Sequence, residues 1–320
     1  MEPSRPVKLV VAHPEGAARR VLQRLVGATP TPVDAVGDAA ALRAVVDADT
    51  IAIVDIALAR NEPELHAHPA RAWIAVTDDE PAAQSAVDEL LMRGWWHVVA
   101  HPMPVLAEEL LVTVQKLRRG EAFGLDKYIS WSAEVRSHTL DDTRQRDHAV
   151  AALTADLSAI GLPERVATLA GVIADELIAN ALYIAQLDDR KQRYRAAEAP
   201  ERGAPPQRSR PLRGRDVVTL RWASDARYVA IEVRDRWGTL ELDAVTGRLV
   251  SGKSAAAAGV RGVGLALAYA CCNQLVIDLE PDVMTEVIAL LDIREPRIAL
   301  GRCASYHAFA VDAPREPQEP

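Results

Sequence analysis

The sequence predicts an α/β protein built from two domains. Short apolar runs alternate with helical patterns over residues 7–118, and this alternation is typical of a parallel sheet that helices cover on both faces. Residues 128–293 contain longer helical patterns and alternating strands. With 320 residues, the chain is long enough for two domains that each have a core.

The N-terminal elements follow from apolar runs and helical spacing. The domain is placed at residues 1–120 and is followed by a linker at residues 121–130, because Gly120 and Gly124 interrupt the pattern there. The expected strands are residues 8–12, 50–56, 72–76 and 96–100, and the expected helices are residues 17–26, 39–46, 81–92 and 105–117.

The second domain is placed at residues 131–313, before a tail at residues 314–320 that is expected to be disordered. Residues 186–216 contain four prolines and few apolar residues, which predicts a mobile insertion. A solvated insertion is favoured over a basic arm for an acidic partner. The expected elements are a strand at 128–136, helices at 144–160 and 172–185, a hairpin at 217–222 and 229–233, closing strands at 275–279 and 285–293, and an edge strand at 306–311.

Composition narrows the class of protein. The hydrophobic fraction of 49% and charged fraction of 26% are typical of a soluble globular protein. A net charge of −8 argues against a protein that coats nucleic acid or an anionic membrane. No apolar run is expected to span a bilayer, and the first residues lack the apolar core of a signal peptide. Three cysteines form no disulfide framework, so the cytoplasm is the expected location.

The helix expected at residues 172–185 carries polar residues on one face. Glu176 and Asn180 lie one turn apart and project from the same side. Asparagine is a mediocre helix former, so its presence suggests a role for the side chain. A carboxylate and an amide oxygen suit a largely hydrated Mg²⁺ that carries a phosphate chain. A solvated polar stripe is the alternative.

Two later stretches supply further candidates. A strand-like alternation breaks at Asp235 and Gly238, which places a carboxylate at a strand end beside a turn. Residues 259–274 form a glycine-rich loop that runs into an apolar helix, with Gly262 and Gly264 in a Gly-x-Gly pattern. Exposed amides at such a helix start can bind phosphate oxygens.

The order of these motifs resembles the GHKL ATP-binding fold, which gyrase, MutL, histidine kinases and anti-sigma-factor serine kinases share. The resemblance covers residues 127–293, about half of the chain. Its N box is D-E-L-I-A-N-A at 175–181, its first glycine box is D-R-W-G at 235–238, and its second is G-V-G-L-A-L at 262–267. The elements before the N box resemble the anti-sigma kinase type most. The resemblance implies an α+β sandwich whose mixed sheet is covered by helices on one face.

The resemblance implies ATP and Mg²⁺ as cofactors. Glu176 is then the catalytic residue, as a base or by polarising the attacking group, and Asn180 is the Mg²⁺ ligand. Asp235 accepts a hydrogen bond from the adenine amino group. The other nucleotide-binding candidates, which turn the backbone or face the phosphates, are Gly238, Gly262, Gly264 and Lys253.

The N-terminal domain resembles the receiver domain of response regulators. Asp55 matches the phospho-acceptor at a strand end, and Thr77 matches the switch hydroxyl. The acid pair that holds magnesium in a receiver is replaced by Ala12 and His13, and the expected lysine is replaced by His101. Without those carboxylates, little offsets the charge on a transferring phosphoryl group. A pseudo-receiver used for docking or dimerisation is therefore favoured.

The expected function is an ATP-binding signalling protein, with transfer of the γ-phosphoryl group to a protein serine or threonine as one activity. The alternative is a non-catalytic nucleotide-binding or scaffold regulator, because Trp237 alters the first glycine box and the receiver-like domain lacks metal ligands. A response regulator phosphorylated on Asp55 ranks third. The expected partner is a sigma-factor regulator or another signalling protein. A homodimer stays open, and neither membrane nor nucleic acid is an expected partner.

Overall fold

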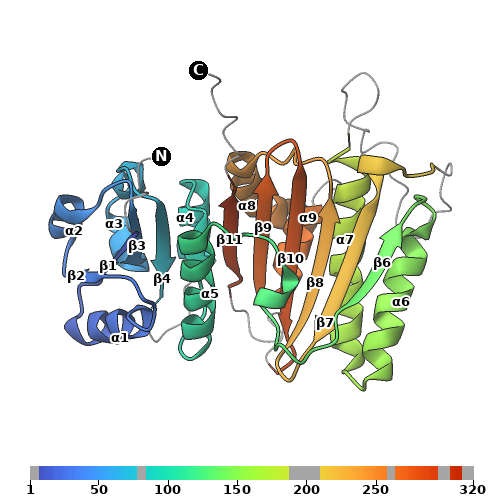
Figure 1. Cartoon of the computed structure of the whole chain (residues 1–320), viewed down its shortest axis with the longest axis horizontal. Coiled ribbons are helices and arrows are strands. Elements are labelled where there is room, and N and C mark those ends of the chain that lie inside the picture. The colour runs from blue at the N-terminus through green and yellow to red at the C-terminus, as the bar shows by residue number, and fades with distance from the viewer. Residues whose placement is uncertain (1–6, 78–83, 187–209, 258–263, 295–302, 312–320) are drawn as a thin grey trace. The chain divides into compact units, whose positions relative to one another are not determined.

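The computed structural model describes residues 7–77, 84–186, 210–257, 264–294 and 303–311, and for residues 253–257 it describes the backbone alone. The chain divides into two compact units (Figure 1). The first unit comprises Met1–Glu121 and Arg302–His307, and the second comprises Ala122–Gly301 and Ala308–Pro320.

The first unit is an α/β domain with a parallel sheet. Its parallel strands are β1 (Lys8–Ala12), β2 (Val33–Val36), β3 (Thr50–Asp55), β4 (Ala72–Val76) and β5 (His97–Val99). They pair in the order β2-β1-β3-β4-β5, which is the order of flavodoxin-like doubly wound sheets. The α/β class predicted from the alternation is confirmed for this unit.

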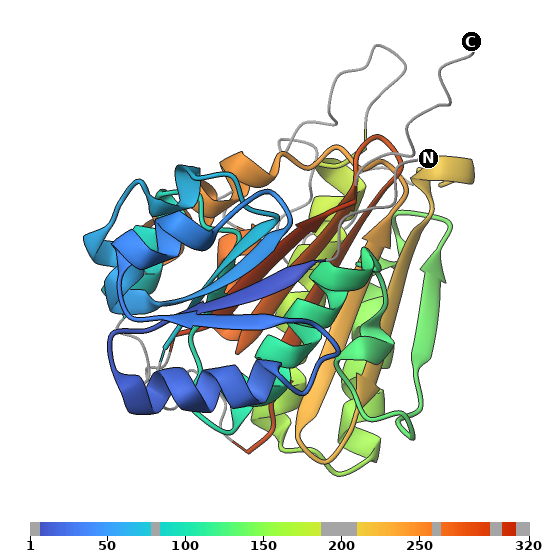
Figure 2. The same ribbon diagram turned by 60° about the vertical axis from the view of Figure 1, so that its left-hand side comes forward.

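Helices join these strands and complete the core of the first unit. They are α1 (Gly16–Val26), α2 (Ala39–Val45), α3 (Ile56–Asn61), α4 (Gln84–Met92), α5 (Val105–Arg119) and the short 3₁₀ helix η1 (Leu65–Ala67). Leu22 of α1 and Leu110 of α5 share one apolar cluster with Leu9 and Val11 of β1 and Ile53 of β3. The period of two along each strand therefore places α1 and α5 against one face of this sheet (Figure 2).

The sequence did not predict β2 or α3. In β2 the middle residues, Asp34 and Ala35, are exposed, so the apolar pattern is weak. The strand expected at residues 50–56 ends at Asp55 because this side chain accepts a hydrogen bond from the Leu58 amide at 2.9 Å and caps α3.

Strand β11 (Ser305–Ala310) has a partner that the sequence did not indicate. Tyr306 pairs with Val98 and His307 pairs with His97, and these pairs are antiparallel. The apolar pattern predicted an edge strand at residues 306–311 in the second domain. Pairing with β5 within the first unit carries no local sequence signal, because the two strands are about 200 residues apart in the chain.

The second unit contains an antiparallel sheet in the order β9-β10-β8-β7-β6. Its strands are β6 (Arg136–Leu140), β7 (Val218–Ser224), β8 (Tyr228–Asp235), β9 (Gln274–Glu280) and β10 (Met284–Asp292). Its helices are α6 (Gln145–Ala159), α7 (Glu164–Tyr183), α8 (Leu242–Ala257), α9 (Gly264–Cys271) and the short 3₁₀ helices η2 (Leu125–Lys127) and η4 (Gly214–Asp216). Helices α6, α7 and α9 lie behind the strands in Figure 1.

The strand expected at residues 128–136 is wrong. β6 begins only at Arg136, and the residues before it are irregular. The Ser130 amide and hydroxyl both donate to the Asp225 carboxylate at 3.0 Å, which holds the chain in a turn. The apolar signal at this position is misleading because the Trp131 side chain is 97% exposed.

Helix α7 is the central helix of the second unit. Pro163 precedes it and has no amide to leave unpaired. Its apolar side chains, including Ile173, Leu177 and Ala181, are buried. The sequence analysis expected no run that spans a bilayer. Among the described residues, α7 alone is long and apolar enough to cross a membrane by length and composition, and 61% of its most apolar stretch is buried inside the structure, as in a core helix.

Candidate functional site

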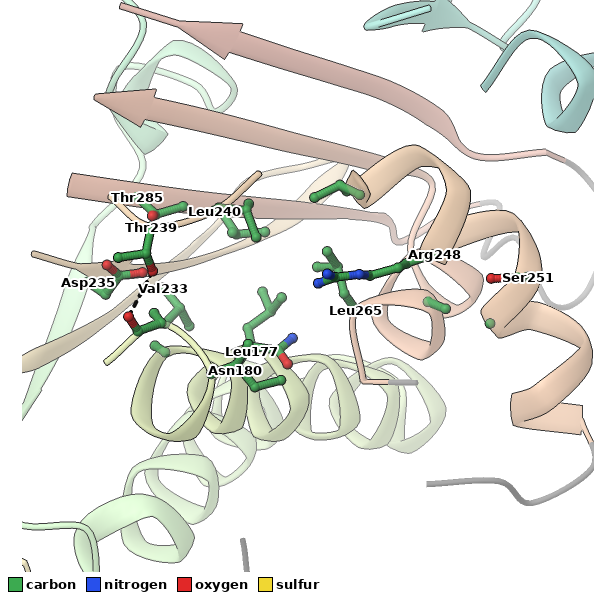
Figure 3. A pocket seen from close by; sticks show the side chains of 17 residues that line it. Leu177, Asn180, Val233, Asp235, Thr239, Leu240, Arg248, Ser251, Leu265 and Thr285 are labelled. Carbon is green, nitrogen blue, oxygen red and sulfur yellow. Dashed lines mark hydrogen bonds between the residues drawn. The ribbon is translucent and has the colours of Figure 1, made fainter. Parts of the chain in front are cut away.

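A cavity of about 300 Å³ lies in the second unit between α7 and the sheet, and α8 and α9 form its remaining walls (Figure 3). This volume is at the lower end of ligand-binding cavities. Its wall is mostly apolar. The apolar residues that line it are Leu177, Ala181, Ile184, Ala185, Val233, Leu240, Val245, Leu265, Ala266 and Val287.

Asp235 is the last residue of β8 and lies at one end of this cavity. Its Oδ1 accepts hydrogen bonds from the Trp237 amide at 2.8 Å and the Gly238 amide at 3.3 Å. Burial raises the pKa of Asp235 to about 6, although both amides lower it. No cation pairs with this carboxylate in the described part of the chain. Such an acid in a cavity is a candidate for ligand binding.

Thr285 of β10 faces Asp235 across the strand pair and lines the same cavity. Its side chain is buried, and its Oγ1 has no hydrogen-bond partner among the described residues. The hydroxyl and the backbone amide of Thr285 both lower the pKa of Asp235, but no hydrogen bond of normal geometry joins the hydroxyl to the carboxylate. An unpaired buried hydroxyl is costly, so a ligand with a polar edge would satisfy both groups.

Asn180 and Glu176 of α7 meet the start of α9. A Cβ atom added to Gly264 would lie 2.6 Å from Glu176 Oε2 and 3.4 Å from Asn180 Oδ1. The first turn of α9 therefore lies directly against the Glu176 and Asn180 side chains, and a side chain at position 264 would displace the Glu176 carboxylate. Asn180 lines the cavity, and its Nδ2 is buried without a partner in the described residues.

Arg248 of α8 enters the cavity from the end opposite Asp235 (Figure 3). No acidic side chain in the described part of the chain pairs with it. The sequence analysis missed this arginine and named Lys253 as the phosphate-facing charge. The available signal was spacing, because Val245 and Leu249 are buried on the inner face of α8 and Arg248 lies between them. The Lys253 side chain lies outside the described residues.

The remaining glycine candidates have different surroundings. Gly238 has a φ of +61°, and an added Cβ would lie 2.2 Å from the Glu280 carbonyl oxygen. It therefore packs against the turn between β9 and β10 and does not line the cavity. Gly262 lies outside the described residues. Asn180 and Asp235 thus share one cavity, and Gly264 contacts the face of α7 that carries Glu176 and Asn180.

The receiver-like candidate Asp55 is buried in the first unit. It is only 5% exposed, and it caps α3 through the Leu58 amide. His13 Nε2 lies 3.6 Å from Asp55 Oδ2, in the position where a receiver has an acid. Thr77 donates to the His101 carbonyl oxygen at 3.1 Å. The protein therefore holds Oδ1 of this carboxylate in a helix cap, and the His13 ring lies beside Oδ2.

A second buried carboxylate in the first unit, Glu109 of α5, was missed by the sequence analysis. It accepts from His101 Nδ1 at 2.8 Å and from His307 Nε2 at 2.7 Å. Burial raises the pKa of Glu109, but the two histidines lower it further, to about 2. Burial also lowers the pKa of His97 well below its usual value, with His307 and Lys116 adding to the effect. Nothing in the sequence distinguishes Glu109 from an ordinary helix-surface glutamate.

Neither unit has a protein-only metal site within its described residues, where no group of three or more His, Cys, Asp or Glu side chains could hold an ion. The Glu109 cluster is therefore a hydrogen-bonded core network. The Glu176 and Asn180 pair fits a different type of site, in which Mg²⁺ takes one or two protein oxygens and its other ligands from water and phosphate.

Comparison with known proteins adds little. No protein-family model matches the chain. No curated protein sequence is significantly similar to it. A solved response regulator from Colwellia psychrerythraea shares 19% sequence identity, and the alignment covers 36% of this chain and 98% of that chain with a TM-score of 0.29. A TM-score this low supports no conclusion about function.

Proposed function

We propose that the second unit binds ATP with Mg²⁺ and that the chain is an ATP-binding signalling protein of the GHKL type. The observation that carries this proposal is the pair of Asp235 and Thr285 at one end of a mostly apolar cavity. A planar apolar ring with one polar edge suits this arrangement, because it buries apolar surface and satisfies the polar groups.

The polar edge of adenine matches this pair. Its exocyclic amino group would donate to the Asp235 carboxylate, and its ring nitrogen beside that group would accept from the Thr285 hydroxyl. Guanine has a carbonyl oxygen in place of the amino group, which would face the carboxylate with no proton between them. Mismatched buried polar groups discriminate strongly between ligands. The cavity is therefore expected to prefer ATP over GTP.

The opposite end of the cavity suits the phosphates. Arg248 supplies a cation, and the first turn of α9 supplies backbone amides beside Asn180. Glu176 places a carboxylate close by, and this charge would repel phosphate by itself. A bound Mg²⁺ would offset that repulsion. The Asn180 amide oxygen and the Glu176 carboxylate oxygens would be the protein oxygens nearest to the ion.

Phosphoryl transfer to a partner protein is the activity we propose for this site. Glu176 lies one turn before Asn180 on the same face of α7, where its carboxylate can accept the proton of an attacking serine or threonine hydroxyl. The resemblance to anti-sigma kinases favours a sigma-factor regulator or another signalling protein as the acceptor. The capped and buried state of Asp55 disfavours phosphorylation of the first unit and favours its use in docking.

Calorimetric titration of the full chain with MgATP and MgGTP tests the binding proposal. We expect MgATP to bind and MgGTP to bind at least about 100-fold more weakly. Asp235→Asn should abolish the preference, because an amide can present a donor or an acceptor to either base. Asp55→Asn is the matched control, since both aspartates are 5% exposed at strand ends, and it should bind ATP as the wild type does. Equal affinity for ATP and GTP in the wild type would exclude this mode of recognition.

Turnover separates a kinase from a non-catalytic regulator. With radiolabelled ATP and Mg²⁺, a kinase loses turnover in Glu176→Gln while it retains ATP affinity. Wild-type protein that binds ATP without turnover in the presence of its partner would instead be a nucleotide-controlled regulator. The observation that favours this second function is the altered first glycine box, in which Trp237 precedes Gly238.

A further inference from the structure

Residues 122–127 cross the face of the second sheet that is opposite the cavity, and we call this segment the strap. In Figure 1 it passes in front of β10 and β8, whereas α7 lies behind them. Within the strap, Ala122 and Leu125 are buried. The strap directly follows Glu121, where the first segment of the first unit ends. A segment predicted as a linker is therefore packed against the sheet.

Two fully buried carboxylates hold the strap. The Gly124 amide donates to Glu286 Oε1 at 2.7 Å, and the Leu125 amide donates to Glu232 Oε2 at 3.1 Å. Both glutamates have no exposed surface. Arg221 and Arg234 pair with them and offset their charge. The two strap amides complete this network, because a buried carboxylate oxygen without a donor is strongly unfavourable.

The backbone of the strap is built for this contact at Gly124. Its φ is +122°, which residues with a side chain rarely adopt. An added Cβ would also lie 2.7 Å from Asp126 Oδ1. Glycine at this position thus allows two successive amides, of Gly124 and Leu125, to point at the sheet.

The strap and the cavity use neighbouring residues of the same two strands. On β8, Glu232 binds the strap while Val233 and Asp235 line the cavity. On β10, Glu286 binds the strap while Thr285 lines the cavity. Side chains alternate between the faces of a strand, so each strand presents one face to each partner. A small shift of either strand therefore moves the glutamates that bind the strap and the residues that line the cavity together.

We propose that docking of the strap and binding of nucleotide are coupled, so that each strengthens the other. This inference rests on the proposed function and concerns its regulation. Strap docking and nucleotide binding both favour one arrangement of β8 and β10. A nucleotide that already orders these strands reduces the conformational entropy that is lost when the strap docks. The coupling is reciprocal by thermodynamic necessity.

Hydrogen–deuterium exchange of the full chain tests this coupling. Saturating MgATP should slow exchange of the Gly124 and Leu125 amides at least about fivefold, which is the lower end of common coupling between sites. In the reverse direction, Glu232→Gln should weaken ATP binding about fivefold or more, although Glu232 does not line the cavity. Gly124→Ala is a second variant that strains the strap and leaves the sheet residues unchanged, and it should have the same effect.

Asp292→Asn is the matched control. Asp292 is a buried acid on β10 that pairs with Arg227, at the far end of the strand from the strap, and its substitution should leave ATP affinity unchanged. Wild-type protein that binds no ATP would overturn the proposed function itself. ATP binding with unchanged exchange at Gly124 and Leu125, or unchanged affinity in Gly124→Ala, would overturn the coupling while the proposed function stands.

Discussion

Asp55 of the first unit and Asp235 of the second are closely matched residues in different surroundings. Each ends a strand and each is 5% exposed. Asp55 accepts a hydrogen bond from one backbone amide of the helix that follows, and Asp235 accepts from two amides of the turn that follows. Asp55 caps α3 and has His13 at 3.6 Å. Asp235 faces a cavity of about 300 Å³ and has no cationic partner among the described residues.

The difference shows that burial of an acid does not by itself mark a binding site. What matters is whether the fold satisfies the carboxylate, as the helix cap to the Leu58 amide does for Asp55. Glu109 makes the same point more strongly, because two histidines satisfy it. A buried carboxylate that faces an apolar cavity without a cationic partner lowers the stability of the folded state. Groups of this kind are concentrated at functional sites.

Replacing Glu109 by glutamine should have the largest effect on stability. A pKa of about 2 against an ordinary value of 4.5 corresponds to about 3 kcal/mol of unfolding free energy at neutral pH. Because the folded pKa is depressed, this stability is present above pH 4.5 and is lost as the pH falls toward 2. Urea unfolding, monitored by hydrogen exchange in β5 of the full chain, measures it. Glu108→Gln, one residue away on an exposed position, should cost little, and an equal cost for both would contradict the role given to the histidines.

Replacing Asp235 by asparagine should have the opposite effect. The folded pKa is raised from 3.8 to about 6, so the folded state binds more protons and loses stability as the pH rises from about 4 to 6. At pH 7 the variant should therefore be more stable than wild type, by at most about 3 kcal/mol. At pH 4 the two should be equal. Thermal unfolding of both proteins at the two pH values measures this difference.

Adenosine binding provides an independent check on the same group. The adenine amino group needs the ionised carboxylate, so affinity should fall about tenfold for each pH unit below 6. Adenosine is used because it has no phosphate to titrate in this range. The Asp235→Asn variant should show no such dependence. A pH-independent affinity in wild type would show that Asp235 does not contact the base.

The sequence predicted those features that depend on local patterns. Alternation predicted the parallel sheet of the first unit, and residue spacing identified Asn180 and Asp235, which line one cavity. The pairing of β11 with β5 could not be predicted, because it joins distant segments that have no shared local pattern. Arg248 and Thr285 were also missed. An arginine on a helix and a threonine in a strand are ordinary surface and sheet residues until the fold directs them into a cavity.

Replacing Arg248 by glutamine should have an intermediate effect that separates the two ends of the cavity. ATP affinity should fall about tenfold, which is within the range of one charge-assisted hydrogen bond. Adenosine affinity should not change, because the base lies at the Asp235 end. Arg236→Gln is the control, since Arg236 is an exposed arginine that does not line the cavity. Parallel calorimetric titrations with both ligands give the comparison, and equal losses for ATP and adenosine would place Arg248 away from the phosphates.

Replacing Asp55 by asparagine should have the smallest effect. Asparagine caps helices about as well as aspartate, so only the weak attraction to His13 is lost. The expected change in unfolding free energy is below about 1 kcal/mol. Acetyl phosphate with Mg²⁺ should label neither the wild type nor the variant, because the carboxylate is 5% exposed and no described acid replaces the missing metal ligands beside it. Labelling of the wild type that disappears in Asp55→Asn would show that the first unit is a working receiver. The two aspartates would then differ in what they bind, a phosphoryl group at Asp55 and a nucleotide base at Asp235.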